Sequence, residues 1–220
     1  MGSSRNLEDI SDGKRYDIND LVKADAGGCE GCSACCHGVG ELFALTPYDI
    51  YEMKKHLELS FDDLIDDKIE IYNENKIQLP HLKMYGEKER CSFLNSEDRC
   101  SIHEFRPNVC RLFPLGRVYE EEDFKYFLQL NACNKSKLGK VKIKKWIKID
   151  NYKENKKFII TWYKLIRALK FRVKFIRDDD ELRIINEDLL DSFYNISIEE
   201  DFYKVFFDRL KDTKLRLGIL

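Results

Sequence analysis

Cysteine is the residue that most constrains this sequence, because its eight copies fall into groups at spacings typical of metal sites. Four are packed into one Cys-x2-Cys-x2-Cys-Cys motif, and three more follow later with a histidine among them. In chain order the candidate ligands are Cys29, Cys32, Cys35, Cys36, Cys91, Cys100, His103, Cys110 and Cys133. Thiolates are soft donors that suit zinc and iron–sulfur clusters. The two groups therefore predict two halves of one metal site, brought together by folding.

The composition is that of a folded protein in a reducing compartment. The 220 residues are enough for one ordinary domain, or a domain with an appendage, and 43% hydrophobic and 12% aromatic residues argue against disorder. The net charge of −2 gives no global reason to expect a nucleic-acid partner. The N-terminal segment lacks the apolar stretch of a signal peptide, and no apolar run approaches the ~20 residues of a transmembrane segment. We therefore expect a cytoplasmic protein whose thiols stay reduced and free to bind metal.

The cysteine spacing leaves zinc and iron–sulfur chemistry both open. Zinc takes four ligands in a tetrahedron and is commonly supplied by Cys-x2-Cys pairs, while iron–sulfur clusters are also held by four cysteines. The bacterial ferredoxin run continues with x3-Cys-Pro, whereas Cys36 and His37 follow at once here. Eight thiolates on one zinc ion would leave a large buried negative charge, which desolvation forbids. Either about half of the cysteines ligate one centre, or there are two centres.

His103 and the nearby arginines have two interpretations each. The spacing Cys100-x2-His103 suits a zinc ligand, but a histidine there can also donate a hydrogen bond to a sulfur or a carbonyl. Negative charge left on a thiolate centre needs cations nearby. The candidates close to the second cysteine group are Arg99, Arg106, Arg111 and Arg117. His56 and His81 are expected to be ordinary surface or packing residues.

The order of motifs predicts a helix-dominated α+β fold. Residues 1–26 form a polar lead-in, residues 27–148 a small cysteine-rich metal-binding domain with short hairpins, and residues 149–220 an α-helical C-terminal region packed on it. Within the domain, Thr46-Pro47-x-Asp49 predicts a helix from Pro47 to about Leu57, and Ser60 with Asp63 predicts a short one after it. Hairpins are expected over 69–79, 91–102 and 117–130, with Pro107 opening a helical turn that carries Cys110.

The C-terminal region contains no cysteine, histidine or proline and has the pattern of amphipathic helices. Its first helix has an apolar stripe at alternating spacings of three and four residues. The stripe consists of Ile159, Trp162, Ile166, Leu169, Val173 and Ile176. Two further helices are expected at roughly 180–193 and 198–215. Segment 153–177 is basic and segment 178–201 is acidic, so we expect them to neutralise each other rather than to bind nucleic acid, anionic lipid or an acidic partner.

Several pieces of sequence around the cysteines occur together in a fixed order. They are Cys29-x2-Cys32-x2-Cys35-Cys36, Leu45-Thr46-Pro47-x-Asp49, Cys91-x-Phe93-Leu94, Cys100-x-Ile102-His103-x2-Arg106-Pro107-x2-Cys110-Arg111-x-Phe113-Pro114, and Cys133. Together they resemble the YkgJ family, which is described as chelating zinc or iron and is named for its CxxCxxCC signature. The resemblance spans roughly residues 27–139, so the helices beyond about residue 150 lie outside it.

The resemblance implies a metal-binding protein with a zinc or iron–sulfur centre built from the two cysteine groups. One branch of the family, the flagellin lysine N-methylases, transfers methyl groups from S-adenosylmethionine to lysines. It implies an alternative function as an iron–sulfur-containing protein-modifying enzyme, and only in that case would S-adenosylmethionine be a cofactor. Those proteins are longer than this chain, and no Gly-rich methyl-donor loop is visible here.

Three classes of function follow from these observations. The first is a metal-binding protein with a structural or redox-sensing centre, whose helical C-terminal region contacts a protein partner. The second is the enzyme, which needs an open metal position or a ligand pocket beside the centre. Its candidate polar residues are Tyr48, Asp49, Arg106 and Arg111. The third is a metal-delivery factor with weak, exchangeable binding.

Overall fold

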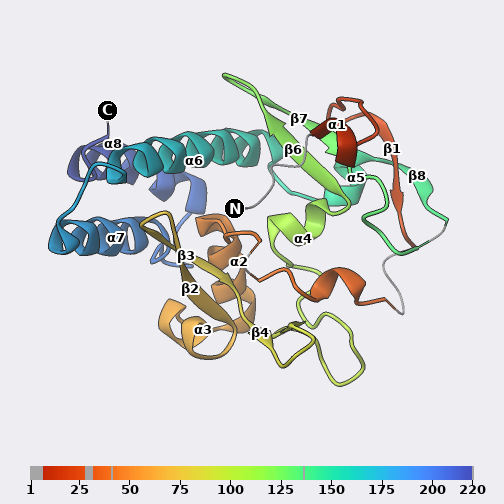
Figure 1. The fold of residues 1–220 in the computed structure, drawn as a ribbon, viewed down its shortest axis with the longest axis horizontal. Coiled ribbons are helices and arrows are strands. Elements are labelled where there is room, and N and C mark those ends of the chain that lie inside the picture. The colour runs from red at the N-terminus through yellow and green to blue at the C-terminus, as the bar shows by residue number, and fades with distance from the viewer. Residues whose placement is uncertain (1–6, 28–31, 41, 136, 220) are drawn as a thin grey trace.

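The computed structural model describes residues 7–27, 32–40, 42–135 and 137–219 (Figure 1). The chain is 41% helix and 20% strand, which confirms the α+β class. Its strands form two-stranded antiparallel sheets, pairing β1 with β8, β2 with β3, β4 with β5 and β6 with β7. No helix within these ranges is both long enough and apolar enough to cross a membrane.

The helices after the first cysteine group begin where the sequence predicts. Helix α2 (Pro47–Leu57) starts at a capping box, in which Thr46 and Asp49 accept each other's backbone N–H. Helix α3 (Phe61–Asp67) starts in the same way at Ser60 and Asp63. Each box satisfies two N–H groups that a helix start would otherwise leave without partners.

A hairpin follows, made of β2 (Ile69–Glu74) and β3 (Ile77–Leu82). Asn75 and Lys76 both have positive φ and make the turn, which is the conformation that tight two-residue hairpin turns need. Ile69, Ile77 and Leu79 are buried. The hairpin therefore places one apolar face in the core.

The hairpin expected over 91–102 is largely wrong. Strand β5 (Arg90–Cys91) pairs instead with β4 (Met84–Tyr85), which precedes it in the sequence. A single β-bridge joins Leu94 to Cys100. The Asn95 side chain accepts the N–H groups of the two residues at 97 and 99, which closes a local turn. That turn replaces a regular strand ladder.

The rest of the cysteine-rich half combines predicted and unpredicted elements. Helix α4 (Asn108–Leu112) carries Cys110 after Pro107, as expected, and β6 (Leu115–Tyr119) pairs with β7 (Phe124–Leu128). The other elements are α1 (Leu7–Ile10), β1 (Leu21–Asp25), the 3-10 turn η1 (Ala34–Cys36), β8 (Gly139–Lys142) and α5 (Ile143–Ile147). The polar lead-in thus supplies a strand, β1, whose Val22 and Ala24 are buried.

Three helices complete the chain: α6 (Tyr152–Val173), α7 (Asp179–Phe193) and α8 (Phe202–Arg216). Figure 1 shows α6 and α7 running side by side next to the β2–β3 hairpin. Helix α8 starts four residues later than predicted, because Asp201 rather than Ser197 accepts the N–H of Lys204 and caps it.

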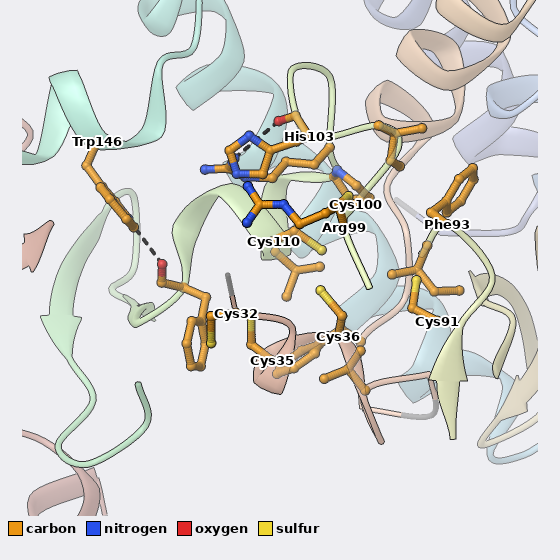
Figure 2. A pocket seen from close by; sticks show the side chains of 18 residues that line it. Cys32, Cys35, Cys36, Cys91, Phe93, Arg99, Cys100, His103, Cys110 and Trp146 are labelled. Atoms are coloured by element: carbon orange, nitrogen blue, oxygen red, sulfur yellow. Dashed lines mark hydrogen bonds between the residues drawn. The ribbon is translucent and has the colours of Figure 1, made fainter. Parts of the chain in front are cut away.

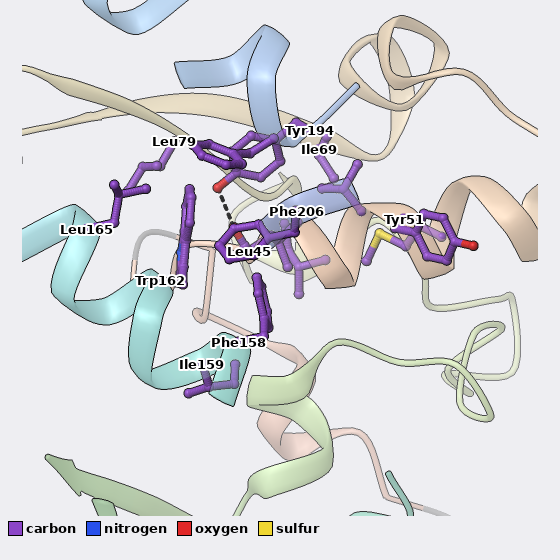
Figure 3. Packing of buried hydrophobic residues seen from close by; sticks show 14 of the residues in the cluster. Leu45, Tyr51, Ile69, Leu79, Phe158, Ile159, Trp162, Leu165, Tyr194 and Phe206 are labelled. Carbon is purple, nitrogen blue, oxygen red and sulfur yellow. Dashed lines mark hydrogen bonds between the residues drawn. The ribbon is translucent and has the colours of Figure 1, made fainter. Parts of the chain in front are cut away.

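The core lies between α6, the C-terminal helices and the β2–β3 hairpin (Figure 3). The Trp162 ring packs against the rings of Phe193, Tyr194 and Phe206. The buried face of α6 consists of Phe158, Ile159, Trp162, Leu165, Leu169 and Val173. Ile166 of the predicted stripe is only half-buried, because Leu165 occupies the central position of this face.

Buried polar contacts tie the helical region to α2. The Lys54 ammonium donates to the carbonyl of Ile196 (2.9 Å), and the Tyr51 hydroxyl donates to the carbonyl of Glu200 (2.9 Å). The Tyr194 hydroxyl donates to the carbonyl of Leu45 (2.9 Å), as Figure 3 shows. Because these groups are shielded from water, losing one partner would leave the other unsatisfied.

The basic face of α6 pairs mostly with acids of the cysteine-rich half. These pairs are Lys156–Asp123 (2.6 Å), Lys164–Glu122 (2.6 Å) and Lys170–Glu74 (2.5 Å). Among the described residues, a single ion pair, Arg172–Glu181 at 2.8 Å, joins segment 153–177 to segment 178–201. The expected mutual neutralisation is therefore limited to that pair. Exposed ion pairs contribute only about 0–1 kcal/mol each, so apolar packing decides how α6 docks.

We expect Leu169→Ala to lower the free energy of unfolding by about 2–5 kcal/mol, because it leaves a cavity in the core. Leu169 is fully buried, whereas Arg167 on the same helix is exposed. Arg167→Ala should change the free energy by less than about 0.5 kcal/mol. Urea unfolding followed by circular dichroism measures both values. Equal effects of the two substitutions would contradict this orientation of α6.

Candidate metal centre

A cavity of about 120 Å³ lies where the first cysteine group meets the second (Figure 2). Six cysteines line it: Cys32, Cys35, Cys36, Cys91, Cys100 and Cys110. They come from segments far apart in the sequence, namely the loop around η1, strand β5, the turn after it and helix α4. Folding therefore brings both groups to one place.

Backbone contacts hold the first group against the second. The carbonyl of Ser33 accepts the N–H of Cys36 (2.8 Å) and lies 3.0 Å from Nδ1 of His37. The N–H of Gly38 then donates to the carbonyl of Glu89, at 3.0 Å, and His37 forms a bridge with Arg90. Since Arg90 precedes Cys91, these contacts fix the η1 turn beside β5.

Asp49 positions the second group. Its carboxylate is 4% exposed, and one oxygen accepts both the N–H and the hydroxyl of Thr46, which starts α2. The other oxygen accepts the backbone N–H and the side-chain amide of Asn108, at 2.7 and 3.0 Å. Asn108 is the first residue of α4, so one buried carboxylate fixes the starts of both helices and thereby places Cys110. Asp49 has this positioning role and does not face the cysteine cavity.

Apolar side chains make up most of the remaining wall. They include Val39, Phe43, Leu82, Phe93, Ile102, Val109, Phe113 and Trp146. The Trp146 indole N–H donates to the carbonyl of Phe113 at 3.1 Å, one of the dashed lines in Figure 2. Such a wall lowers the local dielectric constant and limits access of water to the thiols.

The thiols of the second group are held in their uncharged form. Burial raises the pKa of Cys91, Cys100 and Cys110, and neighbouring thiols add to the rise in each case. Cys35 is one of those neighbours for all three. The five thiols from Cys35 to Cys110 therefore influence one another electrostatically, and a cation among them would remove the repulsion that deprotonation creates.

Cys35 and Cys36 differ in their protonation. A hydrogen bond from the Cys36 thiol stabilises the Cys35 thiolate and lowers the pKa of Cys35 to about 7. The positive charge of Arg106 acts in the same direction. The same hydrogen bond, together with burial, raises the pKa of Cys36. Cys35 is thus the thiol of this pair that is ready to bind a cation near neutral pH.

Two of the four arginines singled out in the sequence reach the cavity. Arg99 and Arg106 line it, and the charge of Arg106 helps to lower the pKa of Cys35 and opposes the rise in the pKa of Cys100. Arg111 instead donates to the backbone carbonyls of two neighbouring residues. Arg117 lies over the ring of Phe124, at 5.2 Å, outside the cavity.

His103 lines the cavity, but its ring nitrogen Nε2 already accepts a hydrogen bond from Arg106. The guanidinium of Arg106 donates to Nε2 of His103 and, at 3.2 Å, to its carbonyl. Partial burial and the surrounding cations, Arg106 foremost, lower the pKa of His103. Direct ligation through Nε2 would require Arg106 to move away, so the role of His103 as a ligand stays a prediction.

The remaining predicted ligands lie apart from the main cavity or outside the described residues. Cys133 lines a smaller cavity of about 30 Å³, which Cys32 and Cys35 also border. Cys29 lies outside the described residues. Among the residues that are described, no three His, Cys, Asp or Glu side chains are arranged as a ready-made metal site. Ligation therefore requires thiols that already share a cavity to turn toward a common point.

His81 is a buried residue whose contacts the sequence did not reveal. Its Nδ1 lies 2.7 Å from the carbonyl of Gly40, and its Nε2 lies 3.0 Å from the carboxylate of Glu74. Glu74 also pairs with Lys170 of α6 at 2.5 Å. His81 thus links the end of the cysteine loop to the helical region as a packing residue. His56 is exposed and stacks on Phe105.

Comparison with known proteins agrees with this arrangement. Residues 28–134 match the model of the CxxCxxCC family, described as "Putative zinc- or iron-chelating domain". No curated protein and no solved structure gives a significant match. This match over residues 28–134 confirms the resemblance seen in the sequence and supports metal binding in general. Nothing in these comparisons supports the methyl-transfer alternative.

In reduced, metal-free protein we expect Cys35 to react with iodoacetamide before the other cavity thiols. Its labelling rate should reach half of its maximum near pH 7, because its lowered pKa makes it a thiolate above that pH. Mass spectrometry of labelled peptides over a pH series measures this. Cys36→Ala removes the hydrogen-bond donor and should shift the profile of Cys35 toward higher pH. A Cys35 profile centred near the ordinary thiol value of about 8.5 in the unaltered protein would refute the assignment.

Proposed function

We propose that the CxxCxxCC domain of this chain holds one cysteine-ligated centre, either a zinc ion or an iron–sulfur cluster, in the six-cysteine cavity. The observation that carries the proposal is the convergence of thiols from both cysteine groups in one apolar pocket. Thiolates are the donors that both kinds of centre prefer. The donor set thus fits the metals that the family description names.

We assign the ligands to Cys35, Cys91, Cys100 and Cys110. Cys35 is the thiol of the first group with the lowered pKa, and it interacts electrostatically with each of the other three. In this assignment Cys36 donates a hydrogen bond to the sulfur of Cys35, which is a usual way to tune a thiolate ligand. Cys29, Cys32, Cys133 and His103, which the sequence also predicted as ligands, lie outside this set of four.

The charge balance supports four ligands. Four thiolates leave a net charge of about −2 on a divalent zinc ion or on an oxidised four-iron cluster. Arg99 and Arg106 line the same cavity and offer two positive charges. Additional thiolates would exceed what these two arginines offset, and the apolar wall would make the excess charge costly.

The geometry favours a structural or redox-sensing role for the centre. Its ligands would join the η1 turn to β5 and α4; Gly38 already holds the η1 loop beside β5, and Asp49 anchors α4 on α2. When bound, the metal supplies the positive charge that keeps several thiolates together. Binding releases the protons of Cys91, Cys100 and Cys110, so affinity should rise with pH.

Metal content of protein purified without oxygen tests the proposal. We expect about one equivalent of zinc, or about four equivalents of iron with sulfide and a brown colour. Cys100→Ser and Cys110→Ser should each lower the metal content severalfold, because a thiolate is lost from the ligand set. Cys133→Ser is the matched control and should retain the metal. Unchanged metal content in a Cys100→Ser, Cys110→Ser double variant would sink the proposal.

Metal content also distinguishes the roles of the two adjacent cysteines, Cys35 and Cys36. Cys35→Ser should lose metal to the same extent as Cys100→Ser, whereas Cys36→Ser should keep it, because a hydroxyl still donates a hydrogen bond to Cys35. Loss of metal in Cys36→Ser with retention in Cys35→Ser would reverse the assignment of the two residues.

A further inference from the structure

A second, larger cavity of about 760 Å³ adjoins the cysteine cavity and shares His103, Arg106 and Trp146 with it. We propose that this cavity binds a small molecule through an oxyanion group, a carboxylate or a phosphate, held by Arg106 and Arg111 beside the metal centre. The site goes beyond the proposed metal binding and does not depend on which metal is bound.

The two arginines are held in place by neutral groups. Nε of Arg111 donates to the carbonyl of Arg106 (2.9 Å), and Nη2 donates to the carbonyl of Glu104 (2.6 Å). Its Nη1 lies 3.4 Å from the carbonyl of Lys148. Arg106 is fixed by its bonds to His103. Carbonyls and an imidazole orient the guanidinium groups without neutralising them, while Arg106 also acts on Cys35 and Glu52 acts on Arg111.

Four cations line this cavity without a direct counter-charge. They are Arg106, Arg111, Lys145 and Lys148. Within the described part of the chain, none of them has a carboxylate oxygen within the 4.0 Å of an ion pair. Arg106, Arg99, Lys148 and Arg111 all act on His103, which lies where the two cavities meet. The junction of the cavities is thus electropositive, and an anion there would relieve the repulsion among these cations.

Two acids of the cavity, Asp25 and Glu52, are half-buried, and Glu52 partly offsets the charge of Arg111. Asp25 accepts the N–H of Gly27 at 2.9 Å, and Glu52 lies 3.8 Å from His56. Glu104 and Asp150 are exposed, so solvent and salt screen them more than they screen the half-buried arginines. Lys145 and Lys148 are exposed as well, so the half-buried charges of the cavity are two arginines and two acids. The charges that act most strongly on His103, at the junction, are cations.

The shape of the donors defines the class of ligand. A guanidinium presents parallel N–H groups that match the oxygens of a carboxylate or a phosphate. The rings of Phe105 and Trp146 offer apolar surface for the body of a molecule, and the volume lies in the range of about 300–1,000 Å³ that is usual for ligand pockets. A ligand bound here would reach the edge of the cysteine cavity at His103.

Titration of the full chain with inorganic phosphate and, separately, with succinate tests the site. Isothermal titration calorimetry at constant ionic strength, kept with sodium chloride, separates specific binding from screening. Saturable binding of either probe supports the site, and the probe that binds more tightly identifies phosphate or carboxylate as the preferred group. Absence of saturable binding of both probes overturns the proposal.

Matched variants locate the binding. Lys145→Ala combined with Lys148→Asn removes two cations from the cavity, and asparagine tolerates the left-handed backbone of Lys148. We expect about fivefold weaker binding in this variant and about tenfold weaker binding in Arg111→Lys, which loses the planar fork. Lys144→Ala on the same helix is the control, because Lys144 is exposed and does not line the cavity. Equal affinity in all variants overturns the proposal.

Metal content measured on the same samples tests the metal centre independently of the oxyanion site. Weaker anion binding with unchanged metal content supports the oxyanion site as a distinct feature. Loss of metal in the cysteine variants with anion binding retained also supports it, because the arginines then act without the centre. If Arg111→Lys and the lysine double variant both keep full anion affinity, the site is wrong even when the metal assignment is right.

Discussion

The gathering of six thiols in one apolar cavity, in which Cys91 is buried and Cys36, Cys100 and Cys110 are half-buried, is the constraint on which the rest of the structure depends. Uncharged, these thiols pack as small apolar groups; charged, they lose hydration and repel one another, since burial first and then Cys91 and Cys100 raise the pKa of Cys110. A cation bound in the proposed centre would favour the thiolate form and hold the segments together. Arg99 and Arg106 line the cavity and would serve as counter-charges for the proposed centre.

The scaffold around the cavity is built from polar contacts shielded from water. Asp49 fixes the starts of α2 and α4 with one carboxylate, and His81 connects the carbonyl of Gly40 to Glu74. Because Glu74 also pairs with Lys170, the cysteine loop is linked to α6 through two side chains. The helical region therefore stabilises the cysteine-rich domain through these polar contacts as well as through apolar packing.

Local signals in the sequence predicted local structure well. Thr46 and Ser60 mark helix starts because capping needs only residues within one turn. The strand β1 and the burial of Leu165 in place of Ile166 could not be predicted, since both depend on partners distant in the sequence. The cysteine spacing predicted a metal-binding site. Spacing alone does not show that Arg106 donates a hydrogen bond to Nε2 of His103. Side-chain direction depends on the folded surroundings.

X-ray absorption at the metal edge of protein purified without oxygen tests the thiolate centre most directly. The account predicts an inner shell made of sulfur alone, at about 2.3 Å, whether the metal is zinc or iron in a cluster. Only the iron cluster would add a second shell of iron neighbours. An inner shell dominated by nitrogen or oxygen at about 2.0–2.1 Å would contradict the account, because the metal would then lie outside the cysteine cavity.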